Sequence, residues 1–230
     1  TAFDSMDLAE DRGKFSNILK ELEIPFPPYG VAYNAAEAVE ALEEFRESHP
    51  VQYGQSKTVL GAMMIRAGQY EDANVMIRDG IDWLSEKIGP RHPNVTPMRL
   101  NLAVSLFTLE QFDDAIEMQQ QVVKDYERQY GADASKAADA RYNLGLYLAR
   151  SGRQEAGIEQ LERARAVYAK GDHKVWVAQT DLDISQIRAR TNQPEGALET
   201  ALGARNMLQR ELGRTNLVTL QASLATVDIM

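Results

Sequence analysis

The chain contains no cysteine among its 230 residues. This absence excludes disulfide bonds, a thiolate nucleophile, and zinc or iron–sulfur sites that depend on cysteine ligands. Histidine is also scarce, and His49, His92 and His173 lie far apart with no histidine four residues away. A metal centre on a helix usually needs ligands that share one face, so we expect no metal site and no cofactor.

Long apolar runs are missing as well. The longest falls far short of the roughly 20 residues that a membrane helix requires, and the N-terminus has no basic region followed by an apolar core. We therefore expect a soluble, cytoplasmic protein without a membrane partner.

Positive charge is in short supply. The formal net charge is -9, and residues 1–50 alone hold 11 Asp and Glu against 4 Lys and Arg. Such a chain repels phosphate backbones, so nucleic acid is not an expected partner.

Catalytic motifs are absent too. No serine and histidine approach each other in a known motif, and no glycine-rich phosphate loop follows a strand pattern. The many carboxylates fall on predicted solvent-facing helix surfaces. The sequence therefore predicts a protein that is not an enzyme.

What the chain does have is a period near 41 residues. A large aliphatic residue followed by a small one recurs at intervals of 42, 42 and 40 residues, and a fifth copy follows after 40 more. The copies are Leu60-Gly61, Leu102-Ala103, Leu144-Gly145, Ile184-Ser185 and Leu224-Ala225.

A second marker follows the first four pairs by about a dozen residues. It is a short polar stretch that ends in alanine, at Ala73, Ala115, Ala156 and Ala197. Apolar residues between the markers recur at helical spacing, and turn residues separate them at Gly68, Gly152 and Asn192-Gln193-Pro194. Each period is therefore predicted to be helix, tight turn, helix, with the small residues of both helices where the two cross closely.

This pattern resembles the tetratricopeptide repeat, in the longer form found in kinesin light chains. The linker "EKIGPRHPNV" carries the glycine and His-Pro typical of that form. The resemblance covers about residues 48–230 and implies an all-α fold, a right-handed α-solenoid of antiparallel helix pairs. The expected segments are a domain at 45–230, with repeats at about 53–94, 95–135, 136–174 and 175–214 and a final helix at 215–230.

The resemblance also implies a binding surface, because the first helix of each pair lines the concave face in this family. Asn101 and Asn143 occupy the position where such domains grip a peptide backbone, since an amide both donates and accepts. Lys57, Arg99 and Arg141 would then supply positive charge to acidic side chains or a C-terminal carboxylate.

Two alternatives stay open for these residues. Arginine and asparagine two positions apart do not share a helix face, so only one of each pair can point into the groove. The arginines could instead bond to acidic second helices, at residues such as Asp113, Asp114 and Glu155, and the asparagines to the neighbouring repeat's backbone.

The first 44 residues do not follow the period. Residues 4–41, "DSMDLAEDRGKFSNILKELEIPFPPYGVAYNAAEAVEA", resemble the large subunit of carbamoyl-phosphate synthetase near the start of an ATP-grasp unit. The residues that bind nucleotide in that family lie beyond the point where the match ends, so ATP binding is not implied. This segment is read as two helices around a proline-rich connector that cap the solenoid. Three explanations of this resemblance stay open: a natural fusion, a recombined chain, or chance similarity in a degenerate first repeat.

Together these features predict a non-enzymatic scaffold that binds a peptide or protein partner in its concave groove, with self-association also open. The alternative is a fragment or fusion associated with carbamoyl-phosphate synthetase, in which the repeats are a docking module.

Overall fold

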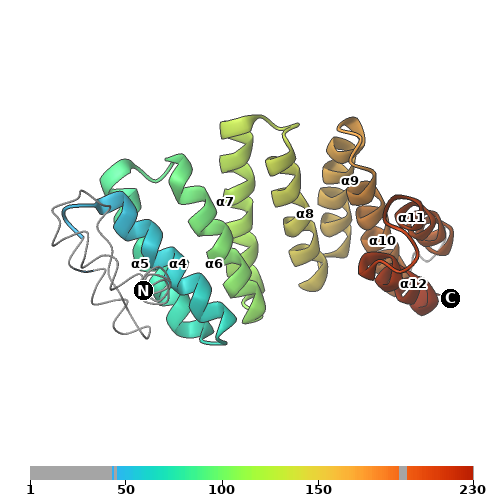
Figure 1. The fold of residues 1–230 in the computed structure, drawn as a ribbon, viewed down its shortest axis with the longest axis horizontal. Helices are drawn as coiled ribbons and strands as arrows, with labels where there is room; N and C mark the ends of the chain where they lie inside the picture. The colour runs from blue at the N-terminus through green and yellow to red at the C-terminus, as the bar shows by residue number, and fades with distance from the viewer. Residues whose placement is uncertain (1–42, 44–45, 192–195, 230) are drawn as a thin grey trace, which may run out of the picture. The chain divides into compact units, whose positions relative to one another are not determined.

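Alternating helices and short turns make up the part of the chain that the computed structural model describes, residues 43, 46–191 and 196–229. The helices, labelled as in Figure 1, are α4 (Pro50–Arg66), α5 (Tyr70–Ile88), α6 (Thr96–Thr108), α7 (Phe112–Tyr130), α8 (Ser135–Arg150), α9 (Gln154–Lys170), α10 (Lys174–Arg190), α11 (Ala197–Leu212) and α12 (Leu217–Ile229), with a short 3₁₀ helix η1 (Pro93–Val95) before α6. Within these described ranges there is no strand, which confirms the all-α prediction. None of these helices is both long enough and apolar enough to span a bilayer.

The chain divides into two compact units, residues 1–89 and 90–230. In the first, α4 and α5 form one antiparallel pair. The expected N-terminal cap and its proline-rich connector lie outside the described residues, as does the expected turn at 192–194. The domain boundary near residue 44 therefore stays a prediction.

The second unit is a stack in which each helix packs on the next in chain order, from α6 to α12 (Figure 1). The helix α12 also contacts α10. Contacts between neighbouring elements define a solenoid, so the repeat architecture predicted from the period is confirmed.

Small residues lie where the paired helices cross. A methyl group added at Gly145 in α8 would lie 2.7 Å from Leu161 Cγ and 2.8 Å from the carbonyl oxygen of Gly157 in α9. Gly61 in α4 is equally close to Ile77 of α5, where an added methyl would overlap Cγ1. At Gly145 the two backbones approach so closely that a methyl group does not fit, whereas at Gly61 the side chain of Ile77 would have to shift.

The marker expected at Ala156 is wrong by one residue. Ala156 is exposed, whereas Gly157 is buried and faces Gly145. With Gly157 in its place, the second-helix markers recur at 42, 42 and 40 residues, the same intervals as the first-helix pairs. The small residues of the first and second helices therefore keep the same register from repeat to repeat.

Glycines with positive φ end three of the second helices. Gly89, Gly131 and Gly213 follow α5, α7 and α11 with φ of 92°, 93° and 86° and ψ of 144°, 156° and 163°. This region is open almost only to glycine, so each helix stops there. Turns inside the pairs use Gly68 and Gly152, also at positive φ.

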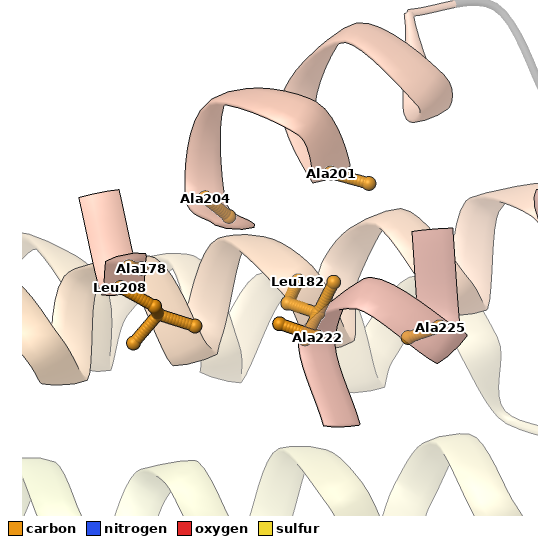
Figure 2. Packing of buried hydrophobic residues seen from close by; sticks show 7 residues of the cluster. All are labelled: Ala178, Leu182, Ala201, Ala204, Leu208, Ala222 and Ala225. Atoms are coloured by element: carbon orange, nitrogen blue, oxygen red, sulfur yellow. The ribbon is translucent and has the colours of Figure 1, made fainter. Parts of the chain in front are cut away.

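The apolar core at the C-terminal end joins three helices (Figure 2). It consists of seven buried residues of α10, α11 and α12: Ala178, Leu182, Ala201, Ala204, Leu208, Ala222 and Ala225. The expected fifth large–small pair, Leu224-Ala225, does not behave like the earlier ones, because Leu224 is 68% exposed while Leu102 and Ile184 are buried. The helix α12 therefore departs from the register of the other first helices.

Candidate functional site

A groove of about 800 Å³ lies along the first helices of the second unit. Its walls come mainly from α6, α8 and α10, with additional residues from the starts of α7 and α9. The lining residues are Phe107, Thr108, Glu110, Phe112, Leu146, Ala149, Arg150, Gln154, Asp183, Gln186, Ile187 and Arg190. First helices thus form the hollowed face, as expected for a repeat of this kind.

One end of the groove is aromatic. The ring of Phe107 stacks on Tyr147, with centroids 4.2 Å apart and planes 11° apart, and meets Phe112 edge-on at 5.5 Å. Burial raises the pKa of the Tyr147 hydroxyl to about 12, so this ring stays neutral at any ordinary pH. The aromatic cluster gives the groove a rigid apolar wall.

Two cations lie on the rim of the groove, Arg150 in the last turn of α8 and Arg190 in the last turn of α10. Both side chains are exposed, and neither has an ion pair or hydrogen bond with any residue in the described ranges. Each complements the negative end of its helix, but each remains available to a ligand.

These two arginines were not predicted from the sequence, although the repeat period carries a signal for them. Arg150 and Arg190 each follow the small residue of their pair, Gly145 and Ser185, by five positions, and Arg66 follows Gly61 in the same way.

Asn101 and Asn143 lie on the helix faces that border the groove. Asn143 precedes the lining residues Leu146 and Arg150 by three and seven positions in α8, so all three share one face. Asn101 has the same relation to Thr108 in α6. Both asparagines are half-buried, and neither has a hydrogen-bond partner among the residues that the structure describes.

Arg99 points away from this face and into α7. Its guanidinium lies 2.6 Å from the carboxylate of Asp125 and donates to the carbonyl oxygen of Pro90 at 2.8 Å. Asp125 is fully buried, and it also accepts a hydrogen bond from Arg128 at 2.7 Å. The side chain of Arg99 is therefore engaged in holding the linker before η1 to the second helix of its own pair.

Arg141 and Lys57 are engaged in the same way. Arg141 of α8 pairs with Glu127 of α7 at 2.6 Å and donates to the carbonyl oxygen of Ala132 at 2.9 Å. Lys57 is buried, and it pairs with Asp79. These contacts correspond to the alternative in which the cations bond to acidic second helices, although through other carboxylates than those expected.

Between α9 and α10 the acid and the base of the ion pair are exchanged relative to the pair between α7 and α8. Asp181 occupies in α10 the place of Arg141 in α8, and it pairs with Arg165 of the preceding second helix, α9. The contact between a first helix and the second helix before it is thus an ion pair in both cases, with acid and base exchanged.

Asp183 occupies in α10 the place of the two asparagines. Its carboxylate accepts hydrogen bonds from the hydroxyl of Tyr142 at 2.6 Å and from the amide of Gln179 at 3.3 Å. Burial raises the pKa of Asp183, and these two donors oppose that shift only in part. Burial and the neighbouring Asp183 also raise the pKa of Tyr142, so the tyrosine remains the donor.

The raised pKa of Asp183 predicts a pH-dependent effect of Asp183→Asn. A carboxyl whose folded pKa exceeds its unfolded value adds stability at low pH, and that contribution is lost as pH rises through the folded pKa. Asparagine keeps an acceptor for Tyr142 without a charge. We therefore expect Asp183→Asn to raise the melting temperature at pH 7 and to lose this gain at acidic pH.

Thermal unfolding followed by circular dichroism across pH 4 to 8 would measure this effect. Asp228→Asn, at an exposed position of α12, is the matched control and should change the melting temperature little at any pH. A gain for Asp183→Asn that does not vary with pH would contradict the prediction.

Comparison with known proteins agrees with this architecture. Residues 94–170, which include α6 to α9, match the family model of the tetratricopeptide repeat. The described structure resembles crystal structures of repeat proteins at low sequence identity. One is a Podosopora anserina protein described as a kinesin light chain with nearly identical TPR-like repeats (TM-score 0.67, 16% identity, 79% of this chain and 86% of that chain).

Two further solved structures share the fold. BtubC (BKLC) from P. vanneervenii has a TM-score of 0.69 at 16% identity, over 85% of this chain and 80% of that chain. MamA has a TM-score of 0.56 at 16% identity, over 77% and 90%. The predicted resemblance to kinesin-light-chain-like repeats is thereby confirmed at the level of the fold.

The second predicted resemblance is also found. The carbamoyl phosphate synthase large chain of Rubrobacter xylanophilus is 36% identical over 93 residues, which are 40% of this chain and 8% of that protein. The C-terminal section from Methanopyrus kandleri is 36% identical over 90 residues, 39% of this chain and 15% of that protein. The chain thus corresponds to a small part of these relatives.

Proposed function

We propose that this chain is a non-enzymatic interaction scaffold that holds a peptide or protein segment in the groove between α6, α8 and α10. The observation that carries the proposal is the combination of a hollow face with polar groups that have no partner among the described residues. Asn101, Asn143, Arg150 and Arg190 all border that face. Amides at the edge of a groove that have no protein partner can exchange water for the backbone of a ligand.

The asparagines are suited to the backbone of the ligand. Each amide can donate to a peptide carbonyl and accept from a peptide N–H, so a row of them fixes an extended segment irrespective of its side chains. Asn101 and Asn143 lie 42 residues apart at the same place in consecutive repeats. The spacing matches a ligand that runs across successive first helices.

The arginines are suited to the charge of the ligand. Lys57, Arg99 and Arg141, which were expected to bind acidic groups of the ligand, are engaged in ion pairs within the chain. We therefore assign the binding of acidic groups to Arg150 and Arg190. A guanidinium binds a carboxylate through two parallel hydrogen bonds. We therefore propose an acidic segment or a C-terminal carboxylate, with an apolar side chain against Phe107 and Phe112.

Selection from a phage-displayed library of 12-residue peptides, followed by calorimetric titration of the selected peptides, would test this proposal. Acidic peptides with an apolar residue should be enriched. Asn101→Ala with Asn143→Ala should weaken their binding at least tenfold, and Arg150→Gln with Arg190→Gln should do the same and reduce the dependence on salt.

The matched controls come from the second helix α11. Asn206→Ala and Arg210→Gln change exposed residues of the same types, and Arg210, like Arg150, lies in the last turn of its helix. These variants should bind as the unchanged chain does. Binding that survives both double variants would overturn the groove assignment.

A second candidate rests on the partial match to carbamoyl phosphate synthase. In that case the repeats are a docking module associated with the synthase, and the partner is a synthase subunit. Surface plasmon resonance with the purified synthase distinguishes the two, because only this candidate expects binding to the folded enzyme.

A further inference from the structure

Three side chains of different chemistry follow one another along the groove face of α10. Trp176, Asp183 and Arg190 are spaced by seven residues, which is about two helical turns, so they share one face of the helix. Asp183 and Arg190 line the groove, and Trp176 is 47% exposed at the N-terminal end of the same face. This face therefore presents an aromatic ring, a carboxylate and a guanidinium in that order.

Asp183 breaks the series of amides to which Asn101 and Asn143 belong. An amide both donates and accepts, whereas an ionised carboxylate only accepts, so Asp183 cannot bind a peptide carbonyl. Its hydrogen bonds from Tyr142 and Gln179 leave acceptor capacity free, because a carboxylate has about four lone-pair sites. Among the residues that the structure describes, Asp183 forms no ion pair. The position therefore suits a positively charged donor from the ligand.

Aromatic rings lie beside this carboxylate. Tyr142 of α8, whose hydroxyl donates to Asp183, meets the ring of Trp176 edge-on, with centroids 5.9 Å apart and planes 77° apart. Trp176 also stacks on Tyr168 of α9, with centroids 5.7 Å apart and planes 27° apart. The two tyrosines hold the indole in place, and almost half of the tryptophan stays exposed. An exposed aromatic face attracts cations, and a guanidinium stacks on such a face better than an ammonium does.

We propose that Asp183 and Trp176 form a subsite for an arginine side chain of the ligand, with the guanidinium on the carboxylate and the aliphatic stem along the indole. Side chains of a helix lean toward its N-terminus, which brings the carboxylate of Asp183 toward Trp176. A ligand carboxylate at this place would be repelled, and a neutral side chain would leave Asp183 without a counter-charge. The subsite rests on the proposed function, because its arginine belongs to the peptide that the groove holds.

The distance from Asp183 to Arg190 gives the ligand a charge pattern. Two helical turns correspond to about 10 Å along the helix axis, and an extended peptide covers that distance in about three residues. A ligand that places an acidic group on Arg190 therefore carries its arginine about three or more residues away. The acidic ligand of the proposed function is thus refined into one with a base at a defined minimum spacing from the acid.

Parallel selections from the library of 12-residue peptides would test the subsite, one on the unchanged chain and one on Asp183→Asn. Arginine should be enriched about three or more residues from an acidic residue on the unchanged chain only. In calorimetric titration, replacing the arginine of a selected peptide by glutamine should weaken binding to the unchanged chain about tenfold, and to Asp183→Asn less than about twofold. The control Glu110→Gln removes an exposed carboxylate of the same groove and should keep the preference for arginine.

A second measurement does not require a peptide in the groove. The chain has two tryptophans, and their indole N–H signals can be followed by NMR while N-acetylargininamide is added. The signal of Trp176, assigned with Trp176→Phe, should shift and saturate. The signal of Trp83 should not move, because that indole is buried and donates to the carbonyl oxygen of Pro50. N-acetylglutaminamide should shift neither signal.

The two measurements separate the subsite from the proposed function. Peptides that bind without a preference for arginine, or a Trp176 signal that N-acetylargininamide does not move, would overturn the subsite and leave the proposed function intact. A library that yields no binder would overturn the proposed function, and the Trp176 signal would then decide the subsite alone.

Discussion

Gly157→Ala is expected to lower the free energy of unfolding by about 2 kcal/mol, although the same change in most helices is stabilising. A methyl group at this position would lie 2.7 Å from the carbonyl oxygen of Gly145 and 2.9 Å from the backbone nitrogen of Ala149. Both contacts are with backbone atoms of α8, which cannot move as a flexible side chain can. The pair α8 and α9 would have to separate, with loss of packing along both helices.

Gly203 provides the matched control. It lies in the second helix α11, and an added methyl group there would meet no atom within 4 Å. Gly203→Ala should therefore stabilise the chain by about 0.5–1 kcal/mol. Urea unfolding followed by circular dichroism would compare the two variants, and a neutral or stabilising Gly157→Ala would contradict the close crossing.

Asp125→Ala is expected to cost about 3–5 kcal/mol. The carboxylate is fully buried between Arg99, at 2.6 Å, and Arg128, at 2.7 Å. Removing it leaves the guanidinium of Arg99, whose side chain is only 12% exposed, without its counter-charge. The carbonyl of Pro90 remains as a partner for Arg99 but does not balance the charge.

An exposed ion pair of the same type provides the comparison. Asp113 pairs with Arg153, and their side chains are 82% and 50% exposed. Asp113→Ala should change stability by less than about 0.5 kcal/mol. In addition, Asp125→Ala combined with Arg99→Met should cost less than the sum of the two single changes, because the buried charge is removed together with its partner. Equal losses for Asp125→Ala and Asp113→Ala in urea unfolding would refute a special role for the buried carboxylate.

The repeat period predicts the alternation of paired helices and most of their crossing points, because close helix packing restricts side-chain size. Gly61 and Gly145 were placed correctly at such contacts. The second-helix marker at Ala156 failed for a physical reason. Ala156 and Gly157 are both small, and only the phase of the helix against its neighbour decides which one faces inward.

The candidate site was less predictable. The direction of a long side chain such as Arg99 depends on which carboxylates the tertiary fold brings near, and Asp125 is 26 residues away in sequence. Asparagine is short and stays close to its own helix face, so the spacing of Asn101 and Asn143 from the lining residues of their helices supports a position beside the groove, and their role in binding stays a prediction. Arg150 and Arg190 became candidates for ligand binding only once the lining of the groove was known.

The exchanged ion pairs between neighbouring helices have a consequence for how such arrays can change by recombination. Arg141 meets Glu127 at one junction, and Asp181 meets Arg165 at the next. Counted from the markers Ala115 and Gly157, the residue of α7 that corresponds to Arg165 is Val123. If the pair α10 and α11 were inserted directly after α7, Asp181 would therefore lose its ion pair. An exchange of repeats would therefore cost a favourable contact at the new junction, of the size expected for a partly exposed ion pair.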